Sequence, residues 1–419
     1  MTKKRYGVAG VIAAAALAVS GLVVPSAHAN NTIVVWADDT RGKNLETVFK
    51  AKSDWVSGYT ITVKTFSTFD ALKAAIDAAT DASGPDIVMG ANDWVPTGGK
   101  SGKLAPVTLT AAQKARFTPG QLFDLTYKGK LYGVPVDVNN VAMIYNTKLV
   151  TTAPKTFGDM VAYYKANKTS KSLKAGLCVA GGGMSWGAHS IFSALGADAY
   201  QFDSRDKIVY NRSFNGTTFG KNVRALLLDG KKSNGFLPAS DAGCKDNFLD
   251  GKVPFAIIGN WEWSDYVAKG FDMNLMPVPG VVANKPGKMF GSVSGALLTT
   301  YAAKHGVEAG AKSLLTNFFG STAGQVLYQK YEGRPPAEKG AALDATVTAA
   351  QRGFGAAASL SSLPQIGAFL NNNAGGANYW DSAPAYWTAV LVDGKDAVTE
   401  GNKLAAIWRA NTSAGKADL

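Results

Sequence analysis

The sequence predicts an α/β protein built as two domains, and three observations support this. Apolar runs alternate with amphipathic segments over residues 32–89 in the order strand, helix, strand, helix, strand, which is typical of a mostly parallel, covered sheet. The length of 419 residues exceeds what one hydrophobic core usually organises. The hydrophobic content of 46% and charged content of 18% are those of a well-packed globular chain.

Residues 1–29 have the features of a secretory signal peptide. Three basic residues at positions 3–5 precede an apolar run over 8–24, and Ser26-Ala-His-Ala29 forms a small-residue cleavage site. We therefore expect cleavage after Ala29 and export to the periplasm or the cell surface. An uncleaved anchor is the alternative because the run is almost long enough to span a bilayer, but Pro25 argues against it.

The cysteines and the charge restrict the class of protein further. Cys178 and Cys244 are the two cysteines, and in an exported chain they predict one disulfide, with two buried thiols as the alternative. No cysteine precedes Cys178, so we expect no lipid on an N-terminal cysteine. The formal net charge is +12, but the basic residues form no run with interleaved aromatic residues, so we expect no nucleic-acid partner.

The first third of the chain places polar residues directly after strands. Strands are predicted over 32–36, 59–65 and 84–89, with helices over 44–52 and 69–79. A polar loop over 37–42 contains Asp39 and Arg41, and a second over 90–94 contains Asn92, Asp93 and Trp94. Ligands bind outside the carboxyl ends of strands in open α/β sheets, so both loops are candidate ligand loops.

The middle of the chain contains an extended run with polar residues at its centre. A hairpin over 128–135 leads into residues 136–146, which include Asp137, Asn139 and Asn140. This pattern favours a strand that crosses between the domains and exposes its centre to a cleft. A helix over 155–166 with Thr156 as its cap follows, then a strand over 173–180 and helices over 189–195, 219–228 and 244–249.

Two indoles follow the next predicted strand. Residues 255–258 form a short buried strand, Gly259-Asn260 ends it, and Trp261 and Trp263 lie beyond. An indole can stack on the C–H face of a sugar ring while its N–H meets a hydroxyl. The alternative is that both tryptophans fill the core, as buried tryptophans commonly do.

The last third contains a second extended crossing over 289–300 and is otherwise mainly helical. Helices are predicted over 309–331, 360–369, 383–392 and 397–409, with a rigid diproline connector over 332–336. A loop over 371–380 ends in Tyr379 and Trp380. Trp55 and Trp408 lie in predicted helices and are interpreted as core residues.

The sequence offers little support for metal or cofactor chemistry. His189 and His305 are the histidines after residue 29, and no His/Cys cluster has the spacing of a metal site, so no cofactor is expected. Asp39, Asp93 and Glu262 could form a glycosidase pair. The separation of two carboxyl groups cannot be read from sequence, so an enzyme remains the alternative.

Taken together, several stretches resemble the sugar-binding class of extracellular solute-binding proteins of ABC importers, typified by maltose-binding protein. The resemblance covers nearly the whole chain after residue 29. It rests on the order and spacing of six pieces, namely Ile33-Val-Val-Trp36, Gly84-Pro-Asp-Ile-Val-Met89 with Ala91-Asn-Asp93, Lys130-Leu-Tyr-Gly-Val-Pro-Val-Asp-Val-Asn-Asn-Val-Ala-Met-Ile-Tyr-Asn146, Lys155-Thr-Phe157, Ala256-Ile-Ile-Gly-Asn-Trp-Glu-Trp263 and Gly333-Arg-Pro-Pro336.

The resemblance implies a two-lobed periplasmic-binding-protein-like fold of type II, with a ligand cleft closed by hinge motion. The implied lobes are 30–138 with 291–335 and 139–290 with 336–419. They would be joined by crossovers near 136–141, 290–295 and 334–339. The implied function is to carry a di- or oligosaccharide to an ABC transporter permease as a monomer without catalysis. A secreted glycoside-active enzyme and a wall-associated carbohydrate-binding adhesion module remain alternatives.

The resemblance also implies roles for individual residues. Asp39 and Arg41 fall in the first ligand loop, and Asn92 and Asp93 fall where an acidic hydroxyl acceptor is usual. Trp186 and Trp261 match aromatic stacking positions, and Tyr379-Trp380 resembles the C-terminal aromatic contact. The sequence departs from the pattern at several positions, which bears on which sugar is bound: Thr40, Gly90, Trp94, Asn139 and Met184.

Overall fold

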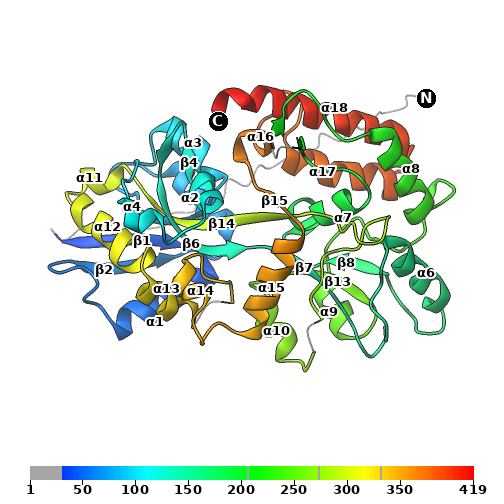
Figure 1. Cartoon of the computed structure of the whole chain (residues 1–419), viewed down its shortest axis with the longest axis horizontal. Coiled ribbons are helices and arrows are strands. Elements are labelled where there is room, and N and C mark those ends of the chain that lie inside the picture. Colours follow the sequence, from blue (N-terminus) through cyan, green and yellow to red (C-terminus); the bar gives the residue numbers. More distant parts are fainter. Residues whose placement is uncertain (1–30, 205–206, 272–273, 331–332) are drawn as a thin grey trace, which may run out of the picture.

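The computed structural model describes residues 31–204, 207–271, 274–330 and 333–419. The expected signal peptide over 1–29 therefore lies outside the described residues. Figure 1 shows two lobes side by side along the long axis of the molecule, with the long strand β14 (Met289–Leu298) running from one to the other. Within the described ranges, no helix combines the length and apolar character needed to cross a bilayer.

The first lobe is organised by a six-stranded mixed sheet. Its order is β15-β14-β3-β1-β2, with β6 also paired to β14. The sheet is less parallel than the sequence predicts, because β14 runs antiparallel to both β3 and β6. The remaining strands are β1 (Thr32–Ala37), β2 (Thr60–Thr65), β3 (Ile87–Ala91), β6 (Gly133–Asn139) and β15 (Ser362–Pro364). Strand β15 pairs with the beginning of β14, Met289–Gly291, and its Leu363 packs in the core of the second lobe.

Helices cover both faces of this sheet, and the first begins earlier than the sequence suggests. Residues 37–42 are not a loop, because the carboxylate of Asp38 accepts from the backbone N–H groups of Thr40 and Arg41 and starts α1 at Asp39. The helix predicted over 309–331 is broken in two by a π-helical turn and Gly320. The helices of this lobe include α1 (Asp39–Ala51), α2 (Phe69–Ala78), α3 (Trp94–Ser101), α12 (Glu308–Leu314) and α13 (Thr322–Gln329).

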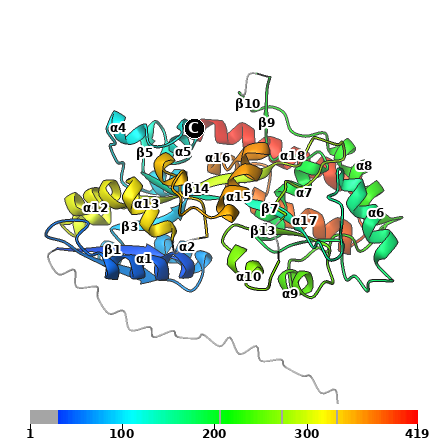
Figure 2. The ribbon, with the colours of Figure 1, turned by 60° about the horizontal axis from the view of Figure 1, so that its bottom comes forward.

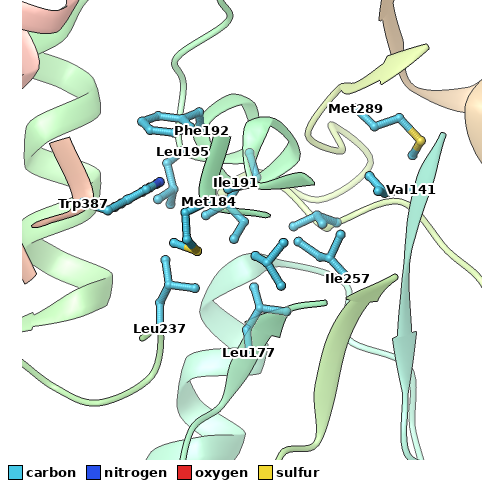
Figure 3. Packing of buried hydrophobic residues seen from close by; sticks show 14 of the residues in the cluster. Val141, Leu177, Met184, Ile191, Phe192, Leu195, Leu237, Ile257, Met289 and Trp387 are labelled. Carbon is cyan, nitrogen blue, oxygen red and sulfur yellow. The ribbon is translucent and has the colours of Figure 1, made fainter. Parts of the chain in front are cut away.

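The second lobe surrounds a three-stranded sheet with the order β7-β13-β8. Figure 3 shows apolar side chains from this sheet and the adjacent helices, including Leu177, Ile191, Ile257 and Trp387, converging on one core. The strands are β7 (Val141–Tyr145), β8 (Leu177–Val179) and β13 (Phe255–Gly259). The helices around them are α6 (Phe157–Asn167), α7 (His189–Ala194), α8 (Gly216–Leu227), α9 (Cys244–Leu249) and α10 (Trp263–Val267).

The C-terminal segment differs most from the sequence-based prediction. The expected helix over 360–369 is wrong: α15 (Ala349–Leu360) ends there, and β15 pairs in parallel with β14. Pro364 explains the change, since proline disfavours a helical conformation at the preceding Leu363. Helices α16 (Gly367–Leu370), α17 (Tyr379–Trp387) and α18 (Ala397–Gly415) follow and pack together. Figure 2 shows α18 extending over the second lobe toward the first.

Shorter elements complete the described chain. They are α4 (Ala111–Lys114), α5 (Pro119–Asp124), β4 (Thr126–Tyr127), β5 (Lys130–Leu131), β9 (Gln201–Phe202), β10 (Ile208–Val209), β11 (Leu228–Asp229), β12 (Lys232–Ser233), α11 (Tyr301–Lys304), α14 (Lys339–Ala342), the π-helical turns Gly183–Gly187, Leu315–Phe319 and Thr388–Val392, and the 3₁₀ turn Lys416–Asp418.

Three crossings connect the lobes and lie close to one another. The extended run over 136–146 is split at Asn140, so that β6 belongs to the first sheet and β7 to the second. The diproline connector runs beside β6, because the N–H of Val138 donates to the carbonyl of Pro335 at 2.9 Å. The third crossing is β14 itself. The extended crossings expected from the sequence are thus strands that share one hydrogen-bonded region.

The structure shows the disulfide predicted from the sequence and the surroundings of the two tryptophans expected in the core. Cys178 at β8 and Cys244 at the start of α9 form a disulfide with Cα atoms 5.6 Å apart. Trp408 is buried in α18, and its indole N–H donates to the hydroxyl of Ser382 at 3.0 Å. Trp55 lies in a turn after α1, not in a helix, and packs edge-on against Phe318.

Candidate functional site

A cavity of about 760 Å³ lies between the two lobes. This volume is in the range that holds small-molecule ligands. Its lining comes from both lobes and the crossings: Asp38, Asp39, Thr40, Arg41, Phe69, Asp70, Lys73, Ala91, Asp93, Trp94, Thr97, Asn139, Gly182, Ser185, Trp186, Trp261, Ser292, Ser294, Arg334, Gln365, Asn371 and Trp380.

Arg41 forms the floor of the cavity on the side of the first lobe. Its guanidinium donates from Nη1 to Asp38 Oδ2 at 2.6 Å and from Nε to Asp137 Oδ2 at 3.1 Å. From Nη2 it donates to Ser294 Oγ at 2.6 Å and to Asn139 Oδ1 at 3.2 Å. Most of its donors are thus taken by protein groups, so Arg41 holds the walls of the cavity together more than it offers donors to a ligand.

The charges in this network keep Asp38 ionised. Burial alone raises the pKa of Asp38, but the guanidinium groups of Arg41 and Arg334 hold the pKa of that carboxyl well below its usual range. Arg334, from the diproline connector, also donates from Nε to Asn139 Oδ1 at 3.0 Å. Asn139, which stands where the resemblance places a carboxylate, is therefore an acceptor for two arginines.

Asp93 presents an unsatisfied acceptor at the cavity wall. Its side chain follows β3, is 8% exposed, and has an oxygen, Oδ1, without a hydrogen-bond partner among the described residues. Burial raises the pKa of Asp93 to about 6, although a backbone hydrogen bond, the nearby charge of Lys73 and side-chain hydrogen bonds from Asn371 and Gln365 lower it in part. A buried acceptor without a partner is costly, so a ligand hydroxyl would be a favourable occupant of this position.

Aromatic rings form opposite sides of the cavity. Phe69 and Trp94 stand on the first lobe with their ring centroids 4.7 Å apart. Trp186 and Trp261 stand on the second lobe with their centroids 5.6 Å apart. Trp380, at the start of α17, adds a third indole on the second lobe.

Two glycines make room for the indoles of the second lobe. Gly182 precedes the π-helical turn with φ of +73°, and an added Cβ would lie 2.5 Å from the ring of Trp186. At Gly259 an added Cβ would lie 2.4 Å from the ring of Trp261. Any larger residue at either position would push an indole out of place, so the glycine after β8 and the glycine that ends β13 determine where the rings stand.

The structure brings together eight of the residues predicted from sequence and places three elsewhere. Asn92 is buried beside the cavity, and its Nδ2 donates to the carbonyl of Gln365 at 2.6 Å. Trp263 begins α10, and its ring packs edge-on against Phe354. Tyr379 is buried under the cavity wall, where its hydroxyl donates to the carbonyl of Ser185 at 3.0 Å. The residues that do line the cavity are Asp39, Arg41, Asp93, Trp94, Asn139, Trp186, Trp261 and Trp380.

The lining also includes residues that the sequence did not single out. Phe69, Asp70 and Lys73 come from the first turns of α2, whereas the loops after strands supply the residues expected from the sequence. The position of α2 just after β2 was the available signal, since helix starts at this edge also face the ligand. Gln365 lies in the segment that the sequence wrongly predicts as a helix, and Asn371 begins the predicted loop over 371–380.

The carboxylates considered for a glycosidase pair do not come together as a group. Glu262 is outside the cavity lining, and its Oε2 accepts from the backbone N–H of Gly259 at 2.9 Å. Asp39 and Asp93 are the two members that line the cavity. Within the part of the chain that the structure describes, no group of three His, Cys, Asp or Glu residues could hold a metal ion.

Comparison with known proteins gives consistent results. The family model described as bacterial extracellular solute-binding protein matches residues 47–354. The chain is 28% identical over 237 residues to the maltotriose-binding protein of Pyrococcus abyssi, covering 53% of this chain and 46% of that protein. It is 26% identical over 267 residues to a maltooligosaccharide ABC transporter solute-binding lipoprotein of Streptococcus pneumoniae, covering 62% of each. The chain thus matches less than two thirds of the length of these curated relatives.

A solved structure has the same fold. The maltotriose-binding protein of Thermus thermophilus, bound with maltotriose, superposes with a TM-score of 0.70 over 90% of this chain and 99% of that chain. The sequence identity is 22%. This likeness confirms the two-lobed binding-protein fold that the sequence predicts.

Proposed function

The chain belongs to the bacterial extracellular solute-binding proteins, and we propose that it binds a neutral di- or oligosaccharide for delivery to an ABC transporter permease. The observation that carries the proposal is the cavity between the lobes, in which indoles stand beside the carboxylate of Asp93, whose Oδ1 has no hydrogen-bond partner among the described residues. The relatives named for maltotriose and maltooligosaccharides support the same class of ligand.

The aromatic lining favours a sugar over other polar solutes. A pyranose ring has flat C–H faces, which an indole covers without any directional requirement, and hydroxyls around its rim. Trp186, Trp261 and Trp380 offer such faces on one lobe, and Trp94 offers one on the other. Stacking accounts for the apolar part of the ligand, while Asp39 and Asp93 are the proposed acceptors for its hydroxyls.

The charges in the cavity favour a neutral sugar. Arg41 and Arg334 are neutralised by Asp38 and Asp137 or engaged by Asn139, so they leave little net field for an anionic ligand. Lys73 forms an ion pair with Asp77 at 2.5 Å. Carboxylate acceptors at the wall favour hydroxyl donors over carboxylate or phosphate groups.

We assign the lobes to residues 30–138 with 291–335 and 139–290 with 336–419. The apolar clusters support this division, since buried residues of the first sheet and those of the second fall almost entirely on either side of these boundaries. The adjacent crossings at Asn140, β14 and the diproline connector would act as a hinge on which the lobes close around the sugar. In this proposal the protein is exported through the signal over 1–29 and works as a monomer without turning over its ligand.

Calorimetric titration with maltose, maltotriose and longer maltooligosaccharides, with chromatography of the same mixtures for products, tests the proposal. We expect saturable one-to-one binding and unchanged sugar. Cleavage of a sugar would instead indicate a glycoside-active enzyme. Binding to insoluble cell-wall polymer, without any change in small-angle scattering on adding soluble sugar, would instead indicate an adhesion module.

A further inference from the structure

The segment over residues 365–371 touches both lobes beside the cavity. Gln365 follows β15, Gly367–Leu370 form α16, and Asn371 ends that helix. Helix α16 packs against α18 of the second lobe and against α3 of the first, and Figure 1 shows it between them. The segment can therefore link side chains of one lobe to side chains of the other.

On the first lobe, the segment holds the turn after β3. Asn92 Nδ2 donates to the carbonyl of Gln365 at 2.6 Å, and Asn371 Nδ2 donates to the carbonyl of Asp93 at 3.0 Å. Between these bonds, Gly367 lies so close that an added Cβ would be 2.7 Å from the carbonyl oxygen of Asp93. The backbone of the residue with the unsatisfied carboxylate is thus fixed from the second lobe.

On the second lobe, the side chains of Gln365 and Asn371 hold indoles. Trp186 Nε1 donates to Gln365 Oε1 at 2.6 Å, and Trp380 Nε1 donates to Asn371 Oδ1 at 2.6 Å. The amide of Asn371 has its orientation set by both neighbours, since an indole only donates and a carbonyl only accepts. Each indole has one polar hydrogen, so these bonds fix its rotation and occupy its donor.

Trp261 differs from the other two indoles. Its N–H has no hydrogen-bond partner within the described ranges, and the guanidinium of Arg334 lies over its ring at 5.6 Å. Among the three indoles of the second lobe, Trp261 therefore keeps a donor for the ligand, while Trp186 and Trp380 offer their faces alone.

We infer that Gln365 and Asn371 are positioning residues, which fix Trp186 and Trp380 as donor-free stacking faces and connect both to the Asn92–Asp93 turn. The inference rests on the proposed sugar-binding function for its effect on affinity. The geometry of the indoles can be tested without any ligand. A bound sugar would then stack its C–H faces on Trp186 and Trp380. At Trp261 it would also accept a hydrogen bond from the indole N–H through a hydroxyl.

The ligand-free test measures solvent exchange of indole N–H protons by NMR on ¹⁵N-labelled protein, with Trp186→Phe and Trp380→Phe used to assign the signals. We expect slow exchange at Trp186 in the parent, at least ten-fold faster exchange in Gln365→Met, and recovery in Gln365→Glu, which keeps an acceptor. An unchanged rate at Trp186 in folded Gln365→Met would overturn the inference, whether or not the glutamate variant folds.

Asn371 allows its two contacts to be separated. Asn371→Asp keeps the acceptor for Trp380 but loses the donor to the Asp93 carbonyl, whereas Asn371→Leu loses both. We expect fast exchange at Trp380 only in the leucine variant. Slow exchange at Trp380 in folded Asn371→Leu would contradict the assignment of this residue.

Calorimetric titration with maltotriose then measures the effect on binding. We expect Gln365→Met and Asn371→Leu to weaken binding about ten-fold, as loss of a fixed orientation of one stacking ring implies. Gln201→Met, in the β9–β10 hairpin outside the cavity lining, is the matched control and should bind as the parent does. Parent-like affinity in Gln365→Met would overturn the role in binding. If the parent does not bind maltotriose, this sugar is not its ligand, and the exchange measurements still decide the positioning role.

Discussion

The guanidinium of Arg41 donates to both carboxylate oxygens of Asp137, from Nε at 3.1 Å and from Nη2 at 3.2 Å. Arg41 stands in the first turn of α1, and Asp137 stands in β6, which leads to the first crossing between the lobes. The two side chains are 4% and 1% exposed, so the pair is shielded from water and salt. It ties the helix at the cavity floor to the hinge region.

Replacing Arg41 by methionine should therefore reduce stability strongly. The change leaves the buried carboxylates of Asp38 and Asp137 without their main counter-charge, which should lower the free energy of unfolding by about 3 kcal/mol or more. Urea denaturation measures the loss. Arg224→Met is the matched control, because its ion pair with Asp396 is about half exposed and should contribute at most about 1 kcal/mol. Equal losses in the two variants would contradict a structural role for Arg41.

Asp93→Asn should weaken sugar binding while stabilising the empty protein at neutral pH. Burial raises the pKa of this carboxyl to about 6 in the folded protein, against an ordinary value of 3.8. The folded protein therefore binds the proton more tightly than the unfolded chain does, and protonation of Asp93 stabilises the fold. That stabilisation is complete below pH 3.8 and is lost as the pH rises through 6, because the ionised form is desolvated. A shift of about two pKa units corresponds to about 3 kcal/mol.

The pH dependence of unfolding tests this prediction. The parent and Asp93→Asn should have similar stability near pH 4, and the variant should be the more stable above pH 6.5. Asp250→Asn, at an exposed position at the end of α9, controls for the loss of a surface charge. A variant that is less stable than the parent at pH 7 would mean that the carboxylate is satisfied within the folded protein.

Trp261→Ala should weaken sugar binding without unfolding the protein. The indole covers apolar sugar surface and keeps its N–H for the ligand, so its removal should cost on the order of 2 kcal/mol or more of binding free energy. Calorimetric titration gives the affinity and thermal unfolding gives the stability. Trp408→Phe is the control, since Trp408 is buried in α18 and its loss should lower the melting temperature with no specific effect on affinity. Parent-like affinity in a folded Trp261→Ala would refute the stacking proposal.

The disulfide between Cys178 and Cys244 should stabilise the second lobe. It closes a loop with a sequence separation of 66 residues, so replacing both cysteines by alanine should lower the unfolding free energy by about 2–4 kcal/mol. Intact-mass measurement after alkylation in denaturant, with and without prior reduction, establishes the bond itself. Two thiols alkylated without reduction would show that the exported protein does not carry it.

Much of the fold could be read from local patterns. Strand β13 is a short apolar run ended by glycine, and α6 is preceded by the capping residue Thr156, so both have signals within a few residues of chain. Where the local signal was weak, the prediction failed: the helix expected over 360–369 contains β15, which forms because β14 offers an edge for pairing. Ser362 of β15 pairs with Met289, and 362 − 289 = 73 residues separate them, so the strand has no signature in its own local sequence.

The candidate site, like the fold, is predictable from the sequence only in its local features. The residue types along the chain are enough to indicate the chemistry, because indoles and carboxylates after strand ends predict a sugar site whatever their partners are. Which of these groups face the ligand depends on how the distant segments pack. It directs Trp261 into the cavity and Trp263 onto Phe354, and it occupies the donors of Arg41, Trp186 and Trp380 with protein acceptors. The physical reason is that a side chain's identity is local, whereas its orientation and its free hydrogen-bonding capacity depend on neighbours brought from distant parts of the chain.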